Sequence, residues 1–315
     1  MTKATLIKYI AQSIGYWNHS GSAVITGKDI TEAMMLDALN YRYLEDVFPR
    51  MAEVKPEFFE QEAQTNTYNT TSTVSSNVTT TLVTVDSIFT SGCVDAKVYN
   101  STEEEIATIV GYTSATTVTL DASYGWTAAD NLYLITGIYT FGSDATDILG
   151  YPLYVGIKYN SDDDDYTKVS LYGANNAYKA AYGRDTFDNF TESNPVYTAT
   201  TIDVSGVFTS AISVKPVPEE PVTNGVHIRY IEKPAELSSD SDVPRLPLGY
   251  QKFIADGAVS DLCDQVLNDH VKADRFEARY QRSLQKLLES ALAFDTTYES
   301  LAVEKKINYF RSRQY

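Results

Sequence analysis

Hydrophobic and polar positions follow a helical pattern near the start of the chain. A first apolar stripe occupies Leu6, Ile7, Ile10 and Ile14, and Gly15 offers a stop. A second stripe follows the capping-box pattern Asp29–Glu32 and is expected to end at Pro49. Its apolar positions are Ile30, Met34, Ala38, Tyr41, Leu44 and Phe48. The pattern predicts two N-terminal helices, with some helical character continuing over residues 53–64.

The pattern becomes helical again after Pro247. One stripe consists of Tyr250, Phe253, Ile254, Gly257, Ala258, Leu262 and Val266. After a plausible break at Asn268–His270, a second stripe consists of Phe276, Tyr280, Leu284, Leu287, Leu288 and Leu292. These stripes predict a helical hairpin or one bent helix of about forty residues.

The middle of the chain has the character of strands. Residues 65–84 contain nine threonines, and β-branched residues disfavour helix. Short apolar runs separated by turn residues then predict five strands, at 82–89, 95–100, 105–112, 117–122 and 131–136. Five strands in so short a stretch suggest a small barrel or sandwich, inserted between helical parts.

Further strands and one helix are expected after Gly142. Residues 148–160 and 166–173 predict a hairpin around the aspartate run 162–165, and residues 174–190 predict a helix broken at Gly183. Three more strands are predicted at 195–203, 206–216 and 224–234.

The expected fold class is therefore α+β: a helical core from the N- and C-terminal helices with an antiparallel sheet, plus the inserted all-β domain. The expected division is 1–64 for the N-terminal helices, 65–139 for the insert, 140–293 for the sheet and long helices, and 294–315 for a C-terminal tail.

Charge limits the kinds of partner. The 315 residues carry a formal net charge of −17, which argues against a surface built to hold nucleic acid. The charge is uneven, because residues 264–315 hold nine Lys and Arg against eight Asp and Glu. Residues 303–315 reach +3, with Lys305, Lys306, Arg311 and Arg313 against Glu304.

No residue pattern predicts catalysis or a cofactor. The three histidines, at 19, 227 and 270, fall in different elements, and Cys93 and Cys263 lack the spacing of metal ligands. The aspartate run 162–165 could hold Ca²⁺, but it lacks the glycine and terminal glutamate of an EF-hand, and a solvated hairpin tip is favoured. We expect no enzyme, no metal and no membrane span, and a protein made in a cytoplasm.

Residues 294–315 combine aromatic and basic side chains. Ordering such a segment costs about 1–2 kcal/mol per residue in backbone entropy, so we expect it to stay loose until a partner covers it. The alternative is an ordinary frayed terminus. The candidate docking residues are Tyr298, Lys305, Lys306, Tyr309, Phe310, Arg311, Arg313 and Tyr315.

The stretch 234–247 reads PAELSSDSDVPRLP and leads directly into the C-terminal helical pattern. Proline fixes φ, disfavours helix in the residue before it and is tolerated in a first helical turn. Pro234, Pro244 and Pro247 are therefore expected to set the angle between a strand and the helix that follows.

The order of these motifs resembles head-tail adaptor (connector) proteins of tailed bacteriophages. The resemblance covers residues 1–60 and 140–293. It consists of a strand ending in Pro-x-Pro, a strand ending in Tyr-x-x-x-Pro-x-x-Leu, an acidic stretch, Pro-x-x-Pro, an aromatic residue and a Gly-Ala helix. The matching residues are Pro216, Pro218, Tyr230, Pro234, Leu237, Pro244, Pro247, Tyr250, Gly257, Ala258 and Tyr280.

The resemblance implies a ring, usually of twelve copies, seated under the portal at the head–tail interface of the virion. Its partners would be other copies of itself, the portal protein and tail, nozzle or tail-fibre proteins, with DNA only as passing cargo. Pro234, Pro244, Pro247, Tyr250, Gly257, Ala258 and Tyr280 would form the elbow and the ring-packing helix. Two alternatives stay open: a β-rich receptor- or carbohydrate-binding phage structural protein, and an acidic hydrolase with dispersed carboxylates.

Overall fold

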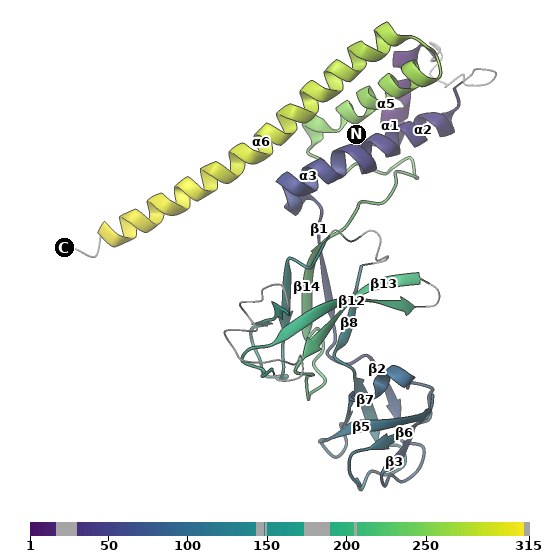
Figure 1. The fold of residues 1–315 in the computed structure, drawn as a ribbon, viewed down its shortest axis with the longest axis vertical. Coiled ribbons are helices and arrows are strands. Elements are labelled where there is room, and N and C mark those ends of the chain that lie inside the picture. Colours follow the sequence, from purple (N-terminus) through teal and green to yellow (C-terminus); the bar gives the residue numbers. More distant parts are fainter. Residues whose placement is uncertain (17–29, 143–147, 149, 173–189, 205–206, 312–315) are drawn as a thin grey trace. The chain divides into compact units, whose positions relative to one another are not determined.

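The computed structural model describes residues 1–16, 30–142, 148, 150–172, 190–204 and 207–311, and describes side chains outside 203–207 and 291–311. The chain divides into two compact units, each built around its own contacts (Figure 1). Residues 1–60 and 233–315 form the first, called here the helical unit. Residues 61–232 form the second, called the β unit.

The predicted fold class is wrong. The described residues are mostly β-sheet, with 14 strands in three sheets, and do not form a helical core with one sheet beside it. Two large apolar clusters lie within those sheets. The physical reason is that β-branched and aromatic residues of the strands bury each other, so the sheets have cores of their own. The label α+β describes this fold only loosely.

The N-terminal helices form as the apolar spacing predicts, but they end elsewhere. Gly15, with φ of +89°, caps α1 in the left-handed conformation that glycine adopts easily. Pro49 does not end the second helix. A π-helical turn at Arg42–Val47 precedes it, and Pro49 then lies in the first turn of α3, where its missing N–H is tolerated. These helices are α1 (Lys3–Ile14), α2 (Glu32–Tyr41) and α3 (Phe48–Val54).

The C-terminal helices form a hairpin, which is one of the two arrangements predicted. A 3₁₀ turn, Leu248–Tyr250, leads into α5 (Lys252–Gln265), and α6 (His270–Arg311) returns along it. The backbone N–H of Lys272 donates to the Asp269 carboxylate at 3.1 Å, which caps the start of α6. Helix α6 continues through the segment expected to be loose, since Ala, Leu, Glu and Lys in residues 291–311 favour helix.

The β unit holds all three sheets. The first has strand order β1-β14-β9-β10, the second β11-β12-β13-β8 and the third β2-β7-β4-β5-β6-β3. The third sheet surrounds one apolar cluster that includes Trp126 and Leu132, and the first two share a second cluster that includes Tyr139 and Ile212.

Several strands follow the predicted segments, but others do not. Strand β8 was not predicted, the segment 148–160 contains a strand only at β9, and the segment 166–173 divides into β10 and β11, which belong to different sheets. Helical character was expected over 53–64, but α3 ends at Val54 and residues 60–64 belong to β1. Residues 174–190, predicted as a helix, fall almost wholly outside the described residues. The strands are β1 (Glu60–Thr65), β2 (Thr70–Thr73), β3 (Thr81–Val83), β4 (Lys97–Asn100), β5 (Glu105–Ser114), β6 (Thr117–Leu120), β7 (Asn131–Ile135), β8 (Ile138–Phe141), β9 (Tyr154–Ile157), β10 (Thr167–Lys168), β11 (Ser170–Leu171), β12 (Val196–Val204), β13 (Val207–Lys215) and β14 (Val226–Ile231).

Candidate assembly site in the helical unit

The elbow, residues 234–247, is bound to the N-terminal helices. The backbone N–H of Lys3 donates to the Asp242 carbonyl at 2.7 Å, and the Lys3 ammonium lies 3.0 Å from the Asp240 carboxylate. The Asn40 side chain accepts from the Leu237 N–H at 3.0 Å and donates to the Leu237 carbonyl at 3.4 Å. Helices from the other end of the chain therefore pair with the polar groups of a segment that lacks regular structure.

The second half of the elbow is held from within the same unit. The buried Gln251 amide donates to the carbonyls of Pro244 and Leu246, at 3.2 and 2.9 Å. The Tyr43 hydroxyl accepts from the Arg245 N–H at 2.7 Å, and burial raises the pKa of Tyr43 to about 12. These contacts fix the point at which the chain enters the 3₁₀ turn before α5.

Gly257 allows α5 and α6 to approach closely. A Cβ added at Gly257 would lie 3.0 Å from Cδ2 of Tyr280 and 3.2 Å from the aliphatic carbons of Arg42. Ala258 beside it is 0% exposed, as is Tyr280. The Gly-Ala pair therefore packs within a single copy of the chain.

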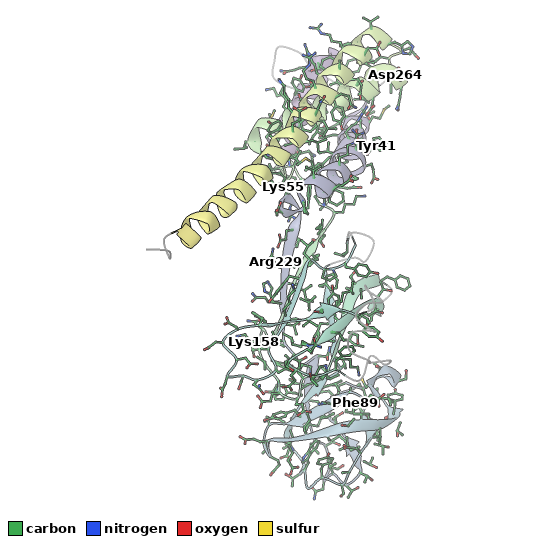
Figure 2. The ribbon with its side chains drawn as sticks, turned by 60° about the vertical axis from the view of Figure 1, so that its left-hand side comes forward. Tyr41, Lys55, Phe89, Lys158, Arg229 and Asp264 are labelled. Atoms are coloured by element: carbon green, nitrogen blue, oxygen red, sulfur yellow. The ribbon has the colours of Figure 1, made fainter. Side chains whose placement is uncertain are left out.

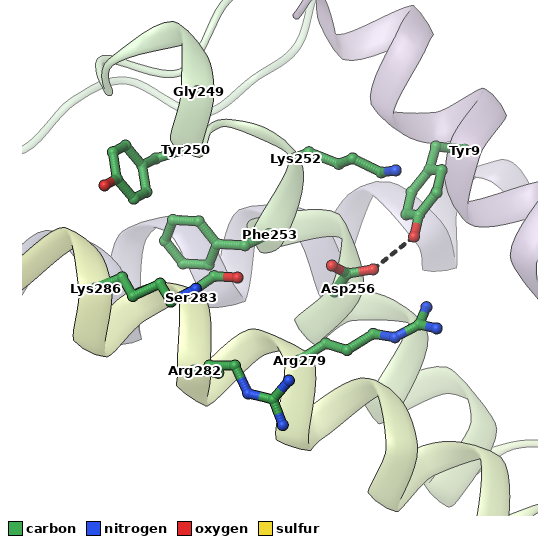
Figure 3. Close-up of a pocket in the computed structure, with 10 residues that line it drawn as sticks. All are labelled: Tyr9, Gly249, Tyr250, Lys252, Phe253, Asp256, Arg279, Arg282, Ser283 and Lys286. Carbon is green, nitrogen blue, oxygen red and sulfur yellow. Dashed lines mark hydrogen bonds between the residues drawn. The ribbon is translucent and has the colours of Figure 1, made fainter.

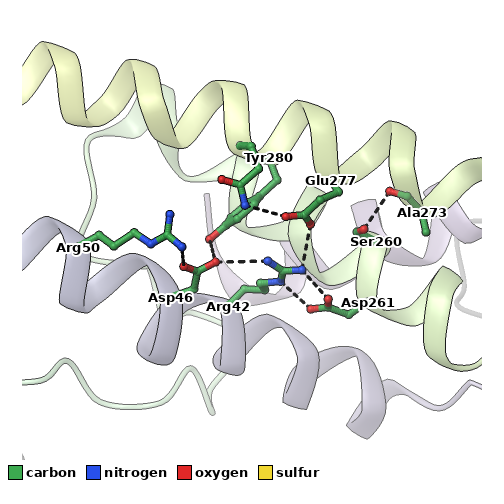
Figure 4. A network of polar contacts seen from close by, with 9 residues as sticks. Arg42, Asp46, Arg50, Ser260, Asp261, Ala273, Glu277 and Tyr280 are labelled. Carbon is green, nitrogen blue, oxygen red and sulfur yellow. Dashed lines mark hydrogen bonds and ion pairs between the residues drawn. The ribbon is translucent and has the colours of Figure 1, made fainter. Parts of the chain in front are cut away.

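A charged network surrounds the Arg42 guanidinium (Figure 4). Arg42 makes a bidentate pair with Asp261, at 2.6 and 2.7 Å, and reaches Glu277 at 3.0 Å and Asp46 at 3.3 Å. Its side chain is only 14% exposed. Burial alone would lower the pKa of Arg42, but the hydrogen bonds and charge of Asp261, with Glu277, raise it above the ordinary value.

Tyr280 joins this network from α6. Its hydroxyl donates to Asp46 at 2.6 Å, and the Arg42 guanidinium lies 4.8 Å from the centre of its ring. Burial and the bond to Asp46 raise the pKa of Tyr280, so it stays a neutral donor. The network ties the π-helical turn to α5 and α6.

An open groove of about 660 Å³ lies between α1, α5 and α6 (Figure 3). Its cations are Lys252, Arg279, Arg282 and Lys286, all exposed, and its only carboxylate is Asp256. We call this surface the basic groove. Its floor is partly aromatic, with Tyr9, Tyr250 and Phe253.

Two of these cations lie over aromatic rings of the chain. The Lys252 ammonium lies 4.3 Å from the centre of the Tyr9 ring, and the Arg279 guanidinium lies 5.2 Å from the centre of the Phe276 ring. Tyr9 itself donates to the buried Asp256 at 2.6 Å. Within the described part of the chain, Arg282 and Lys286 have no carboxylate within 4.0 Å. The basic groove thus presents unneutralised positive charge on a protein whose net charge is −17.

A second surface of the helical unit is acidic. Two smaller hollows, of about 360 and 280 Å³, share Asp37 and Tyr41. The second hollow also includes Glu45 and Glu236. Tyr41, labelled in Figure 2, is the last residue of α2. Its side chain is 61% exposed. We call Asp37, Tyr41, Glu45 and Glu236 the acidic face.

The sequence-predicted residues fall into two groups. The elbow and helix residues all lie in the helical unit: Pro234, Pro244, Pro247, Tyr250, Gly257, Ala258 and Tyr280. The docking residues Tyr298, Lys305, Lys306, Tyr309, Phe310 and Arg311 lie on α6, beyond its described side chains. Arg313 and Tyr315 fall outside the described residues.

The aspartate run 162–165 forms the tip of the β9–β10 hairpin. The Asp163 carboxylate accepts from the N–H groups of Tyr159 and Asn160, at 2.9 and 3.0 Å. The Lys158 ammonium donates to the carbonyls of Asp163 and Asp164, so a cation of the chain itself lies among these oxygens. Among the described residues, three or more metal-ligating side chains nowhere gather as a cation site would require.

The described helices also show no candidate for a membrane span, since none combines the needed length with enough apolar residues. Sequence reasoning missed the Arg42 network and the basic groove. The groove had a visible signal, because Arg279, Arg282 and Lys286 recur at helical spacing on α6. The network had none, because Arg42 and Asp261 are 219 positions apart.

Comparisons with known proteins add no relative. No protein-family model matches this sequence, and a search of curated proteins gives no significant match.

Proposed function

We propose that this chain is a structural subunit of a ring between the portal and the tail of a tailed bacteriophage. The ring would continue the DNA channel and give the tail or nozzle its attachment platform. The observation that carries the proposal is the order of motifs from Tyr230 and Pro234 through Pro244–Pro247 and Tyr250 to Gly257–Ala258, resembling head-tail adaptor proteins. Copies would assemble in the host cytoplasm and end at the head–tail interface of the virion.

Packing in the helical unit supports this proposal. Asn40, Tyr43 and Gln251 form hydrogen bonds to the backbone of the elbow. Gly257 allows the close contact with Tyr280. Leu237, Pro244, Gly257 and Tyr280 of the motif therefore take part in the packing of a single copy. A rigid helical unit is what repeated copies need in order to meet at one angle and close a ring.

The charge of the chain supports a passive role toward DNA. A conduit should not hold its cargo, and an acidic wall repels phosphate while salt limits the range of the repulsion to about 8–10 Å. The net charge of −17 fits such a wall. We assign DNA the role of passing cargo.

The remaining parts are assigned to the other partners. The end of α6, residues 294–311, would contact the portal through its basic and aromatic residues. The six-stranded sheet would contact tail, nozzle or tail-fibre proteins. On that sheet, β5 carries Val110, 52% exposed, and Tyr112, 39% exposed, as apolar contact positions.

Electron microscopy of the particle that contains this chain tests the proposal. An antibody fragment against residues 61–232 should label the neck between head and tail, with several copies around one axis. Label at fibre tips would contradict the proposal, and binding of glycans by the six-stranded sheet together with such label would favour the receptor-binding alternative.

Deletion of residues 294–315 tests whether this segment makes the contact with the portal. Circular dichroism should show that the remaining residues of the shortened chain keep their secondary structure. The shortened chain should no longer sediment with portal rings. Unchanged co-sedimentation would remove the portal assignment of this segment.

A further inference from the structure

The basic groove and the acidic face lie on opposite sides of α5. Asp256 borders the basic groove, whereas Gln265 borders the hollow beside Tyr41. These residues are nine positions apart, and nine steps of about 100° make two and a half turns, so they point to opposite sides of the helix. One copy can therefore be contacted at both surfaces at once.

Each surface has charges that the chain does not neutralise itself. Among the described residues, Asp37 and Glu236 have no cationic partner within 4.0 Å, as Arg282 and Lys286 have no anionic one. Glu45, by contrast, is paired with Lys233 at 2.6 Å. Like charges gathered on one surface repel each other, and the opposite surface of another copy would relieve both repulsions.

Both surfaces also offer exposed apolar area. Leu248, 80% exposed, precedes Gly249 and Tyr250 of the basic groove. Tyr41, 61% exposed, stands between the two hollows of the acidic face. Tyrosine exposed in one state and buried in another is typical of protein interfaces.

We propose that the basic groove of one copy receives the acidic face of the next, with Tyr41 packed against Tyr250 and Phe253. The contact is heterologous, because different surfaces of the two copies meet, and repetition of such a contact gives a ring or an open filament. The inference rests on the proposed function and names the contact that joins neighbouring subunits.

A nucleic acid could also neutralise the cations of the basic groove, but the charges favour a second copy. Phosphate would meet a chain of net charge −17. A second copy supplies carboxylates at Asp37 and Glu236 together with the aromatic side chain of Tyr41. The acidic face would have no role if DNA occupied the groove.

Charge exchange between two variants tests the contact. The groove variant carries Arg282→Glu and Lys286→Glu, and the face variant carries Asp37→Lys and Glu236→Lys. In an equimolar mixture, the reversed groove of the first variant can bind the reversed face of the second. The unchanged face of the first variant can likewise bind the unchanged groove of the second. A control variant, Lys168→Glu with Lys272→Glu, changes the net charge as much as the groove variant does but lies outside both surfaces.

Association is measured by sedimentation velocity at about 0.05 M salt, where charges act over more than about 10 Å. We expect the wild type and the control to associate alike, and each charge-reversed variant alone to associate at least about tenfold more weakly. The mixture should recover wild-type association. Circular dichroism establishes that every variant is folded.

Three results would overturn the inference: a wild type that stays monomeric, variants that associate as the wild type does, or a mixture that recovers nothing. A shift of duplex DNA by the wild type that the groove variant loses would assign the groove to nucleic acid and also overturn it. Rings that form equally in all variants would leave the proposed function standing and remove only this contact. Association through these surfaces, without label at the neck of the particle, would keep this contact and contradict the proposed function.

Discussion

Gly257 shows how one missing side chain sets the distance between two helices. Gly257→Ala gains up to about 1 kcal/mol in helix propensity. It also places a methyl group 3.0 Å from the fully buried Tyr280, and such crowding costs about 1–3 kcal/mol. We expect a net loss of about 1 kcal/mol in the free energy of unfolding, measured by urea denaturation.

Gly249→Ala is the matched control for this substitution. A Cβ at Gly249 meets nothing within 4 Å, so the stability should stay within about 0.5 kcal/mol of the wild type. Equal effects at the two glycines would show that close approach to Tyr280 is not what requires a glycine.

Arg42 compensates three carboxylates, and two of them have little access to water. Arg42→Met removes the cation but leaves Asp46 and Asp261, whose side chains are 17% and 18% exposed. Removing one partner of a buried ion pair costs about 3–5 kcal/mol, and partial exposure reduces this to about 2–3 kcal/mol. Urea unfolding of the variant should show that loss.

Arg50→Met supplies the comparison, because Arg50 contacts the same Asp46 but is 50% exposed. An exposed helical pair of this kind contributes about 0.3–0.5 kcal/mol. If Arg50→Met cost as much as Arg42→Met, the attribution of the larger effect to burial would be wrong.

At the scale of elements, one carboxylate stabilises the turn at 238–242 within the elbow. Asp242 accepts from the N–H groups of Ser238 and Ser239, at 2.8 and 2.7 Å, and these bonds lower its pKa. A lowered folded-state pKa means that the stabilisation is complete above the ordinary Asp value of about 4 and is lost as pH falls through the folded value.

Asp242→Ala should therefore lower Tm at neutral pH, and the difference from the wild type should shrink as pH falls below about 4. Thermal unfolding followed by circular dichroism from pH 7 to pH 2 measures this. Asp240→Ala is the control, since Asp240 is 79% exposed and pairs only with Lys3 among the described residues. A difference that stays constant with pH would show that the carboxylate charge is not responsible.

The sequence predicts an element where the spacing of its own apolar residues determines whether it is a helix or a strand. It does not predict an element whose type depends on contacts with distant segments. The α5–α6 hairpin follows from its apolar stripes and the break at 268–270. The continuation past Pro49 depends on the π-helical turn at Arg42–Val47, which the Arg42 network stabilises from distant residues. Strand β1 forms because it pairs with β14, whereas its own sequence, EQEAQT, favours helix.

The candidate site divides in the same way. The elbow was visible from its prolines and acidic residues, because those residue types act on their own backbone. The basic groove combines Tyr9, Lys252 and Arg282 from three helices, and the acidic face combines Asp37 with Glu236. Which distant segments meet is decided by packing, and a single sequence does not reveal it.

At the scale of the whole molecule, apolar burial explains why the predicted fold class failed. The strands of the β unit enclose clusters around Leu132 and Ile212, each of these residues 0% exposed. In the helical unit, Ile254 and Leu6 are also 0% exposed. Both units therefore have buried apolar side chains enough to hold their own structure.

Separate apolar clusters predict separate unfolding. Leu132→Ala and Ile254→Ala should each cost about 2–5 kcal/mol, because each removes fully buried methyl groups and leaves a cavity. In calorimetry of the intact chain, Leu132→Ala should lower the transition of the β unit and Ile254→Ala that of the helical unit. Each substitution serves as the control for the other. One shared transition that both substitutions lower together would contradict this prediction, because it would mean that the two units unfold as a single cooperative body.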